Sequence, residues 1–177
     1  MLRLGHRPER DQRVTTHVGL VGRALGAKGM LLAADDQGIE RSMKKVTKQW
    51  GGNFFVKTGV NWREELKGWK QVGGKVCHLT MYGENILDVI DEIREEAKKE
   101  NARLMVVVGA EKVPYEIFEA ADWNIAVGNQ PHSEIAALAL FLDQLQEGKE
   151  LKAVFEHAEL YIVPKRRGKE VIVTRKE

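Results

Sequence analysis

Short apolar runs alternate along this 177-residue chain with longer segments whose apolar positions recur every three or four residues. The short runs predict strands at residues 2–4, 29–34, 53–57, 75–81, 103–108 and 123–127. The longer segments predict helices at residues 15–24, 38–50, 62–72, 84–100, 114–121 and 133–147. Regular alternation of strand and helix is typical of βαβ units, so the pattern predicts an α/β fold with a parallel sheet flanked by helices.

Two of the predicted helices have contrasting patterns. Segment 84–100 carries one apolar stripe among acidic and basic residues, as expected for a helix with a single face on the core. Residues 135–142, in contrast, contain no polar side chain. A helix that is apolar all round is a buried helix. We therefore expect the helix after the last core strand to be enclosed by other parts of the protein.

Residues 151–177 follow a different pattern. The runs LYIVP and VIVT flank KRRGKE, which predicts a β-hairpin with Gly168 in its turn. The length of the chain suits one domain. We expect residues 1–150 to form that domain and residues 151–177 to be an extension of it rather than an independent unit.

The charge and cysteine content narrow the class of protein. Charged residues make up 31% of the chain, yet the formal net charge is only +2. A surface for nucleic acid must therefore come from local clusters of basic residues. A single cysteine, Cys77, excludes an internal disulfide. The charged N-terminus differs from a secretory signal, and no apolar run approaches a membrane span in length. We expect a cytoplasmic protein with no membrane partner.

Several common site motifs are absent from the sequence. No two of the 17 glycines are spaced G-x-G, and no Gly-Lys pair is followed by Ser or Thr, so the dinucleotide and P-loop phosphate motifs are both missing. The metalloprotease motif H-E-x-x-H and the hydrolase motif G-x-S-x-G are missing as well. The five histidines are scattered, and we expect no metal site.

Three predicted strands end in polar or glycine-bearing turns, at residues 77–83, 106–114 and 125–133. Neighbouring parallel strands would bring these turns to one edge of the sheet, where α/β proteins bind ligands. Glycine lets the backbone approach a ligand closely, which suits a ligand recognised by its edge, such as an adenine ring. The alternative is that these are ordinary turns, with Ser133 as the N-cap of the next helix.

Several long strings in these turns match a known family. GAEKVP after the VVV run, VGNQPHSEIAALALFLD after the next strand, the opening RLGHRPERDQRVTTHVGLVGRALGA and the central HLTMYG together resemble the SPOUT methyltransferases. The chain looks most like their archaeal tRNA (cytidine-56) 2′-O-methyltransferase subfamily. The resemblance implies S-adenosylmethionine as methyl donor, tRNA as substrate, a deep trefoil knot and a homodimer. A knot and a second subunit would both help to enclose the apolar helix.

The resemblance also implies which residues form the site. The family's S-adenosylmethionine site falls on Leu79, on Gly109, Ala110, Glu111, Lys112 and Val113, and on Val127, Gly128, Asn129, Gln130, Pro131, His132, Ser133 and Glu134. The catalytic candidate is Arg23, with His17 in the position where the family has an asparagine. A neutral arginine is costly. We therefore expect Arg23 to position the ribose phosphate and stabilise the developing alkoxide rather than act as the base.

Two groups of basic residues are candidates for RNA contact. The first group is expected to be spread through an N-terminal loop that leads into the Arg23 helix, and it comprises Arg3, Arg7, Arg10 and Arg13. The second, in the turn of the predicted hairpin, includes Arg166 and Arg167. Arginine suits phosphate binding, although Glu9 and Asp11 lie within the first group and charged hairpin turns are often only solvated.

Three alternatives remain open on the sequence. The first is the same chemistry on another nucleotide or another RNA. The second is an RNA-binding protein that keeps the knot without catalysis, which the intact cofactor loops and Arg23 disfavour. The third is an unrelated α/β enzyme for a small metabolite, which the missing phosphate motifs and the N-terminal arginines disfavour.

Overall fold

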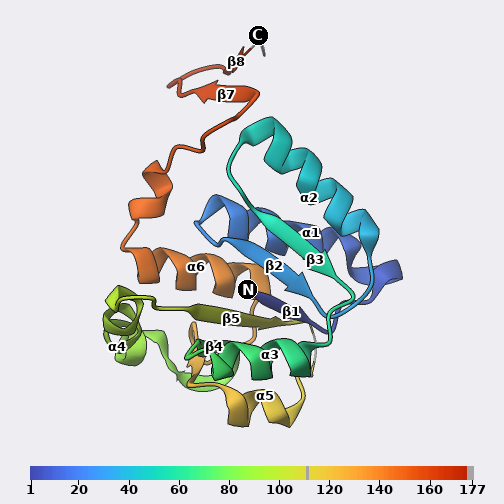
Figure 1. The fold of residues 1–177 in the computed structure, drawn as a ribbon. Helices are drawn as coiled ribbons and strands as arrows, with labels where there is room; N and C mark the ends of the chain where they lie inside the picture. The colour runs from blue at the N-terminus through green and yellow to red at the C-terminus, as the bar shows by residue number, and fades with distance from the viewer. Residues whose placement is uncertain (111, 175–177) are drawn as a thin grey trace.

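A parallel sheet forms the centre of the molecule (Figure 1). The computed structural model describes residues 1–110 and 112–174. Within them the sheet has six strands in the order β3-β2-β1-β5-β4-β6, and every neighbouring pair is parallel. The strands are β1 (Leu2–Leu4), β2 (Gly29–Leu32), β3 (Phe55–Thr58), β4 (Lys75–Asn85), β5 (Leu104–Gly109) and β6 (Trp123–Ala126). The α/β fold and its parallel sheet are confirmed.

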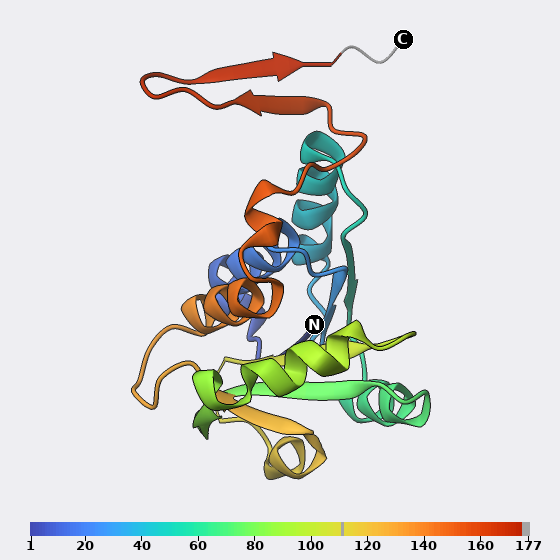
Figure 2. The ribbon, with the colours of Figure 1, turned by 90° about the vertical axis from the view of Figure 1, so that its left-hand side faces the viewer.

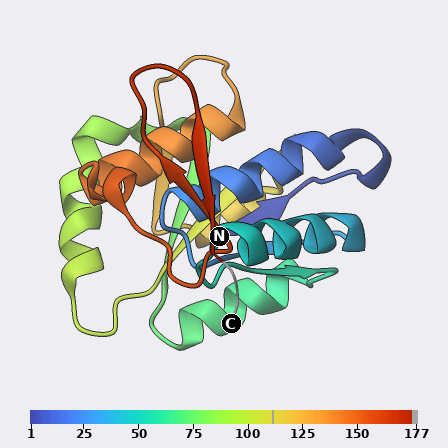
Figure 3. The same cartoon turned by 90° about the horizontal axis from the view of Figure 1, so that it is seen from above.

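Helices cover both faces of this sheet. They are α1 (Pro8–Ala24), α2 (Gln37–Trp50), α3 (Trp62–Gln71), α4 (Ile86–Lys98), α5 (Tyr115–Ala120) and α6 (Glu134–Gln146). Helices α1, α2, α4 and α6 pack on one face around a large apolar cluster, and α3 and α5 pack on the other around a smaller one. Seen from above, α6 lies between α1 and α4 (Figure 3). Because β5, β4 and β6 are parallel neighbours in the sheet, their carboxyl ends meet at one edge, as expected.

Helix α1 begins seven residues earlier than the predicted position 15, at Pro8. Proline suits the first turn of a helix, and Glu9 and Asp11 favourably oppose the positive end of the helix dipole. The buried face of these first turns carries Asp11 and Thr15 rather than large apolar residues, so the hydrophobic pattern missed them. As a correction, Arg10 and Arg13 lie on a helix and not in a loop.

Helix α6 is only partly enclosed within one chain. Its side chains Leu138, Phe141 and Leu142 are buried in the large apolar cluster. On the other side, Ala136 is exposed and Leu140 is 51% exposed. Within the single chain, the sheet, α1 and α4 cover one side of the helix and leave the other side open. The resemblance assigns this open side to a second subunit.

The segment after β6 is tied to the end of β4. The side-chain amide of Asn129 donates to the carbonyl oxygens of Met81 and Gly83, both at 3.0 Å. The resemblance implies a trefoil knot in which the chain after the last core strand is threaded through a loop, and these bonds hold that segment of the chain against the end of β4.

The C-terminal part forms the predicted hairpin. After a short 3₁₀ helix, η1 (Lys149–Lys152), strands β7 (Leu160–Val163) and β8 (Glu170–Val173) pair antiparallel, with Gly168 in the turn at φ 83°. The hairpin projects from the end of the molecule near α2 (Figure 2). It is joined there by backbone hydrogen bonds such as that from Glu159 N–H to the Gln49 carbonyl, 2.9 Å.

Candidate active site

A cavity of about 510 Å³ opens at the carboxyl ends of β4, β5 and β6. The three turns singled out in the sequence form its walls. Ten of the predicted cofactor residues line it: Leu79, Gly109, Ala110, Lys112, Val113, Val127, Gln130, Pro131, His132 and Glu134. The size lies within the range of small-molecule sites, about 300–1,000 Å³. The structure thus brings most of the predicted cofactor residues to one place.

Three other predicted cofactor residues do not line the cavity but shape its walls. Gly128 adopts φ 78°, a backbone conformation that favours glycine, at the turn after β6. Asn129 makes the two bonds to the end of β4 already described. Ser133 caps α6, since its hydroxyl accepts from the backbone N–H of Ile135 at 3.2 Å. The remaining predicted residue, Glu111, lies outside the described residues.

Six further residues of the cavity wall were not among the cofactor residues predicted from the sequence. They are His78, Thr80, Met81, Tyr82, Phe118 and Ala137. Four of them belong to the HLTMYG string, which already marked this strand as unusual. No sequence signal marked Phe118, because it reaches the cavity from α5 only through the tertiary arrangement. A lining of apolar side chains with a few polar groups suits a nucleoside with a charged tail.

His78 is a neutral part of the wall. Its Nδ1–H donates to Oδ1 of Asn124 at 2.8 Å, and the Asn124 amide in turn donates to the Phe118 carbonyl at 2.9 Å. Burial lowers the pKa of His78. Its Nε2 is buried and has no hydrogen-bond partner within the part of the chain that the structure describes. This imidazole is therefore held in one tautomer and is poorly placed to carry a proton.

A buried arginine joins two sides of the cavity. Arg3 lies in β1, in the middle of the sheet, and is 0% exposed. Its guanidinium donates to the Gly109 carbonyl at 2.9 Å and to the Glu134 carboxylate at 3.0 Å. The expectation that Arg3 lies in a loop open to RNA is thus corrected, because its polar atoms are used inside the protein.

Arg23 lies at the opposite edge of the sheet from the cavity. Helix α1 starts near the carboxyl end of β1, and Arg23 is in its last turn. The guanidinium donates to the Gly51 carbonyl at 2.6 Å and lies 4.6 Å from the centre of the Phe155 ring. Burial lowers the pKa of Arg23. His17 is exposed on the same helix. Within one chain, the structure does not bring Arg23 to the cavity.

The other candidate RNA contacts lie at the surface. Arg10 and Arg13 are exposed on the first half of α1, at the same edge of the sheet as the cavity. Arg7 donates to the carboxylate of Asp11, which lowers the pKa of Asp11 to about 2. Arg166 and Arg167 are exposed in the hairpin turn. The exposed arginines therefore form two separate surfaces, one near the cavity and one on the extension.

Metal and thiol chemistry find no support in this site. Residues 1–110 and 112–174 contain no group of three or more His, Cys, Asp or Glu side chains that could hold a metal ion. Cys77 is buried in β4, and burial raises its pKa to about 12, so the thiol is unreactive.

None of the helices in residues 1–110 and 112–174 has the length and hydropathy of a membrane span.

Solved structures share the fold. The chain resembles the A. aeolicus TrmH/SpoU tRNA modifying enzyme with a TM-score of 0.55 at 19% identity, over 85% of this chain and 74% of that one. It also resembles a SpoU methyltransferase from Streptomyces viridochromogenes in complex with AdoMet, with a TM-score of 0.51 at 15% identity, over 83% and 57% of the two chains. The fold is therefore that of the SpoU/TrmH class of methyltransferases.

Sequence similarity is more specific. Residues 50–172 match the family described as tRNA ribose 2′-O-methyltransferase, aTrm56. The chain is 59% identical over 172 residues to the tRNA (cytidine(56)-2′-O)-methyltransferase of Methanosarcina barkeri, which covers 97% of this chain and 94% of that protein. The protein belongs to the aTrm56 family of tRNA ribose 2′-O-methyltransferases.

Proposed function

We propose that this protein transfers a methyl group from S-adenosylmethionine to the 2′-hydroxyl of cytidine 56 in tRNA. The observation that carries the proposal is the cavity of about 510 Å³ built from the three predicted loops, in a chain of this family. The relative from Methanosarcina barkeri is named for this reaction. The lining of the cavity supports the choice of cofactor, because its apolar side chains suit an adenosine moiety and its polar side chains suit an amino-acid tail.

Apolar residues hold the adenosine moiety and exclude water from it, namely Leu79, Val113, Val127 and Phe118. Lys112, Gln130 and Glu134 are polar residues of the same lining. S-adenosylmethionine supplies a sulfonium methyl group that is already a good electrophile. The work of the protein is to hold the ribose 2′-oxygen in line with that methyl, and such alignment is worth about 7–11 kcal/mol in favourable cases.

The proton of the 2′-hydroxyl needs an acceptor. His78 is a buried part of the cavity wall whose imidazole is held neutral by burial and by its bond to Asn124, and Glu134 is paired with Arg3. Neither side chain is arranged as a free general base. The proton therefore passes to water or to a phosphate oxygen of the RNA, while a positive side chain stabilises the developing alkoxide.

Arg23 is proposed as that side chain on the strength of the resemblance. Since it lies away from the cavity of its own chain, it would have to reach the cavity of a second subunit. Arg23→Lys is then expected to lower kcat by about 10²-fold or more, as loss of a transition-state donor does, with S-adenosylmethionine affinity unchanged. A variant with normal kcat and lower thermal stability would instead assign Arg23 to the packing around Gly51 and Phe155.

The surface arginines are proposed to bind the tRNA backbone. They are Arg7, Arg10 and Arg13 near the cavity, and Arg166 and Arg167 on the hairpin. Arginine binds phosphate through a forked pair of donors. Residues 151–177 would then act as an extension that widens the tRNA surface of the 1–150 core. A tRNA-modifying enzyme of this kind would work in the cytoplasm.

A homodimer is proposed because α6 keeps an open apolar side. Ala136 and Leu140 are exposed next to the buried face of the helix, and Ile162, Ile172 and Val173 are exposed on the hairpin. A second copy of the chain would cover such surface. Leu140→Arg is expected to shift the mass measured by sedimentation from dimer to monomer, whereas a wild-type chain that is already monomeric would refute the proposal.

The proposed reaction is tested with an unmodified tRNA transcript and labelled S-adenosylmethionine, followed by mapping of the modified ribose. A 2′-O-methyl group at cytidine 56, absent when that ribose is replaced by 2′-deoxyribose, is the expected result. A methyl group at another nucleotide would keep the chemistry and refute the target. Binding of S-adenosylmethionine without any transfer would favour a non-catalytic RNA-binding protein.

A further inference from the structure

Arg3 is the point at which two walls of the cavity are joined. Gly109 is the last residue of β5, at the start of the second loop, and Glu134 is the first residue of α6, after the third loop. Both line the cavity. The two terminal nitrogens of Arg3 hold one each, at 2.9 Å from the Gly109 carbonyl oxygen and 3.0 Å from Glu134 Oε1. A single side chain thus sets the distance between the two loops.

The burial of Arg3 makes this link costly to break. Its side chain is fully buried. Among the described residues, the carboxylate with which it forms an ion pair is that of Glu134. A buried charge that loses its partner is strongly unfavourable, since desolvation is no longer offset. The forked guanidinium also fits two acceptors at once, which the single ammonium of lysine does not.

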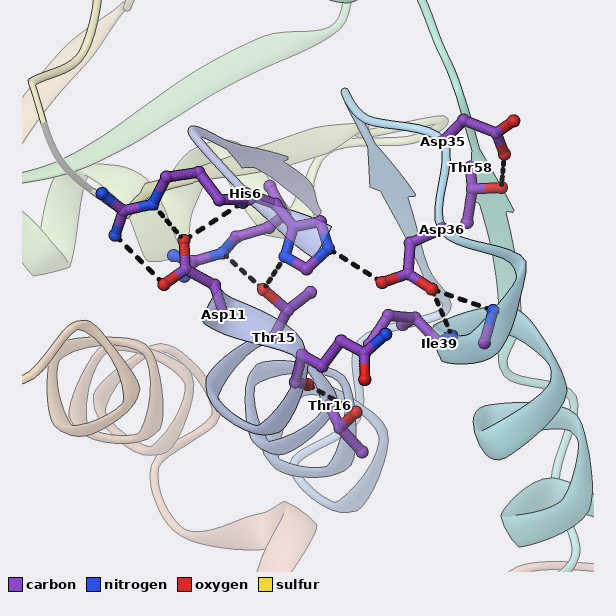
Figure 4. Close-up of polar contacts among 12 residues, drawn as sticks. His6, Asp11, Thr15, Thr16, Asp35, Asp36, Ile39 and Thr58 are labelled. Atoms are coloured by element: carbon purple, nitrogen blue, oxygen red, sulfur yellow. Dashed lines mark hydrogen bonds and ion pairs between the residues drawn. The ribbon is translucent and has the colours of Figure 1, made fainter. Parts of the chain in front are cut away.

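A hydrogen-bond network fixes Arg3 from behind. Its Nε–H donates to the hydroxyl of Thr15 on α1 at 3.4 Å. The Thr15 hydroxyl lies 2.9 Å from Nδ1 of His6, and Nε2–H of His6 donates to Asp36 at 3.1 Å. Figure 4 shows His6 between Thr15 and Asp36. The second oxygen of Asp36 accepts from the backbone of Gly38 and Ile39 at the start of α2. Arg3 is therefore anchored to two helices.

We propose that Arg3 is a positioning residue for the cofactor site, which holds the Gly109 carbonyl and the Glu134 carboxylate in the arrangement that binds S-adenosylmethionine. The inference rests on the proposed function of the cavity. Arg3 acts through these two groups and touches neither the cofactor nor the RNA. The second oxygen of Glu134 has no protein partner among the described residues, so it is available to a ligand in the cavity that Glu134 lines.

The test compares Arg3→Lys with Arg10→Lys, which changes an exposed arginine on α1. Binding of S-adenosylmethionine is measured by calorimetry, binding of tRNA by filter retention, and KM and kcat for each substrate by methyl transfer. Arg3→Lys is expected to weaken S-adenosylmethionine binding by about tenfold or more, because one of two charge-assisted bonds is lost. Its tRNA affinity stays unchanged. Arg10→Lys should leave the S-adenosylmethionine affinity as it is.

Two results would overturn the proposal. The first is an Arg3→Lys protein with normal S-adenosylmethionine binding and weaker tRNA binding, which would make Arg3 an RNA contact. The second is a lower melting temperature with both affinities unchanged, which would make its role purely structural. If Arg3→Lys does not fold, Glu134→Gln and Thr15→Val serve instead. Both should weaken cofactor binding, and normal binding by both would refute the idea.

The wild-type protein separates this inference from the function on which it rests. If the wild type binds S-adenosylmethionine and the variants bind it equally well, only the role of Arg3 fails. If the wild type does not bind S-adenosylmethionine at all, the proposed function fails first.

Discussion

Gly83 offers the sharpest test of how the cavity is built. It lies near the end of β4, where the pairing with β6 changes register between Leu79 and Glu84. A Cβ atom added to Gly83 would lie 2.3 Å from the backbone carbon and oxygen of Asn124 and 2.5 Å from the backbone nitrogen of Ile125. These are backbone atoms of β6, so no flexible side chain can move aside. Gly83→Ala must therefore separate the end of β4 from β6.

The size of the effect follows from these distances. Ordinary van der Waals contact begins at 3.4 Å, so one backbone must move by about 1 Å, which is the scale of overpacking that costs 1–3 kcal/mol or more. We expect a loss of about 2–4 kcal/mol of unfolding free energy, seen as a melting temperature lower by roughly 5–15 °C. Met81 and Tyr82 of the same segment line the cavity. A misplacement of this size lowers methyl transfer by about 10²-fold.

The assay is thermal unfolding followed by methyl transfer well below the melting temperature. Gly168→Ala is the matched control. Gly168 adopts a positive φ, at 83°, but apart from its chain neighbours no atom of the described residues lies within 4 Å of the position that its new methyl group would take. It should cost about 1–2 kcal/mol and leave cofactor affinity unchanged. A Gly83→Ala protein with wild-type melting temperature and wild-type activity would refute the reasoning about how β4 and β6 meet.

Three further predictions concern other parts of the molecule. Burial lowers the pKa of His78 from its ordinary value of 6.5, so its contribution to stability is present above about pH 6.5 and is lost as the pH falls below that value. When the unfolding free energy is measured with urea at pH 7.5 and at pH 5, it should fall less between the two pH values in His78→Leu than in the wild type. An equal fall in both proteins would contradict this. Gly68 lies inside α3, and outside its own helix backbone and chain neighbours no atom of residues 1–110 and 112–174 comes within 4 Å of a methyl group added there. Gly68→Ala should therefore raise the unfolding free energy by about 0.5–1 kcal/mol, seen as a higher melting temperature in a thermal scan, and a lower melting temperature would contradict the open space. Replacing Arg166 and Arg167 with alanine should reduce the salt dependence of tRNA binding by up to about two counterions, and an unchanged slope would mean that the hairpin turn is only solvated.

The accuracy with which the sequence predicts a helix depends on what that helix buries. Helix α4 was placed to within two residues, because a single apolar stripe at helical spacing has one interpretation. Helix α1 was cut short, because its first turns bury Asp11 and Thr15 in polar contacts that have no hydrophobic signature. Hydrophobic periodicity detects elements that bury carbon and misses those that bury a hydrogen-bond network.

The same limit applies to the charged residues. Arg3, Arg10 and Arg23 look alike in the sequence. In the structure Arg3 is buried in the sheet, Arg10 is exposed on α1, and Arg23 lies in the last turn of the same helix. Residue type gave their chemistry, but the depth of each guanidinium depends on which strands and helices surround it.

The sequence by itself determined the βα alternation, the three loops at one edge of a parallel sheet and the C-terminal hairpin, because each of these follows from local periodicity and turn chemistry. Only the tertiary structure decided that β4 lies between β5 and β6, that Phe118 and His78 join the cavity wall, and that Arg3 spans from β1 to Gly109 and Glu134. These contacts join residues up to 131 positions apart. They depend on strand order and packing, which no local pattern encodes.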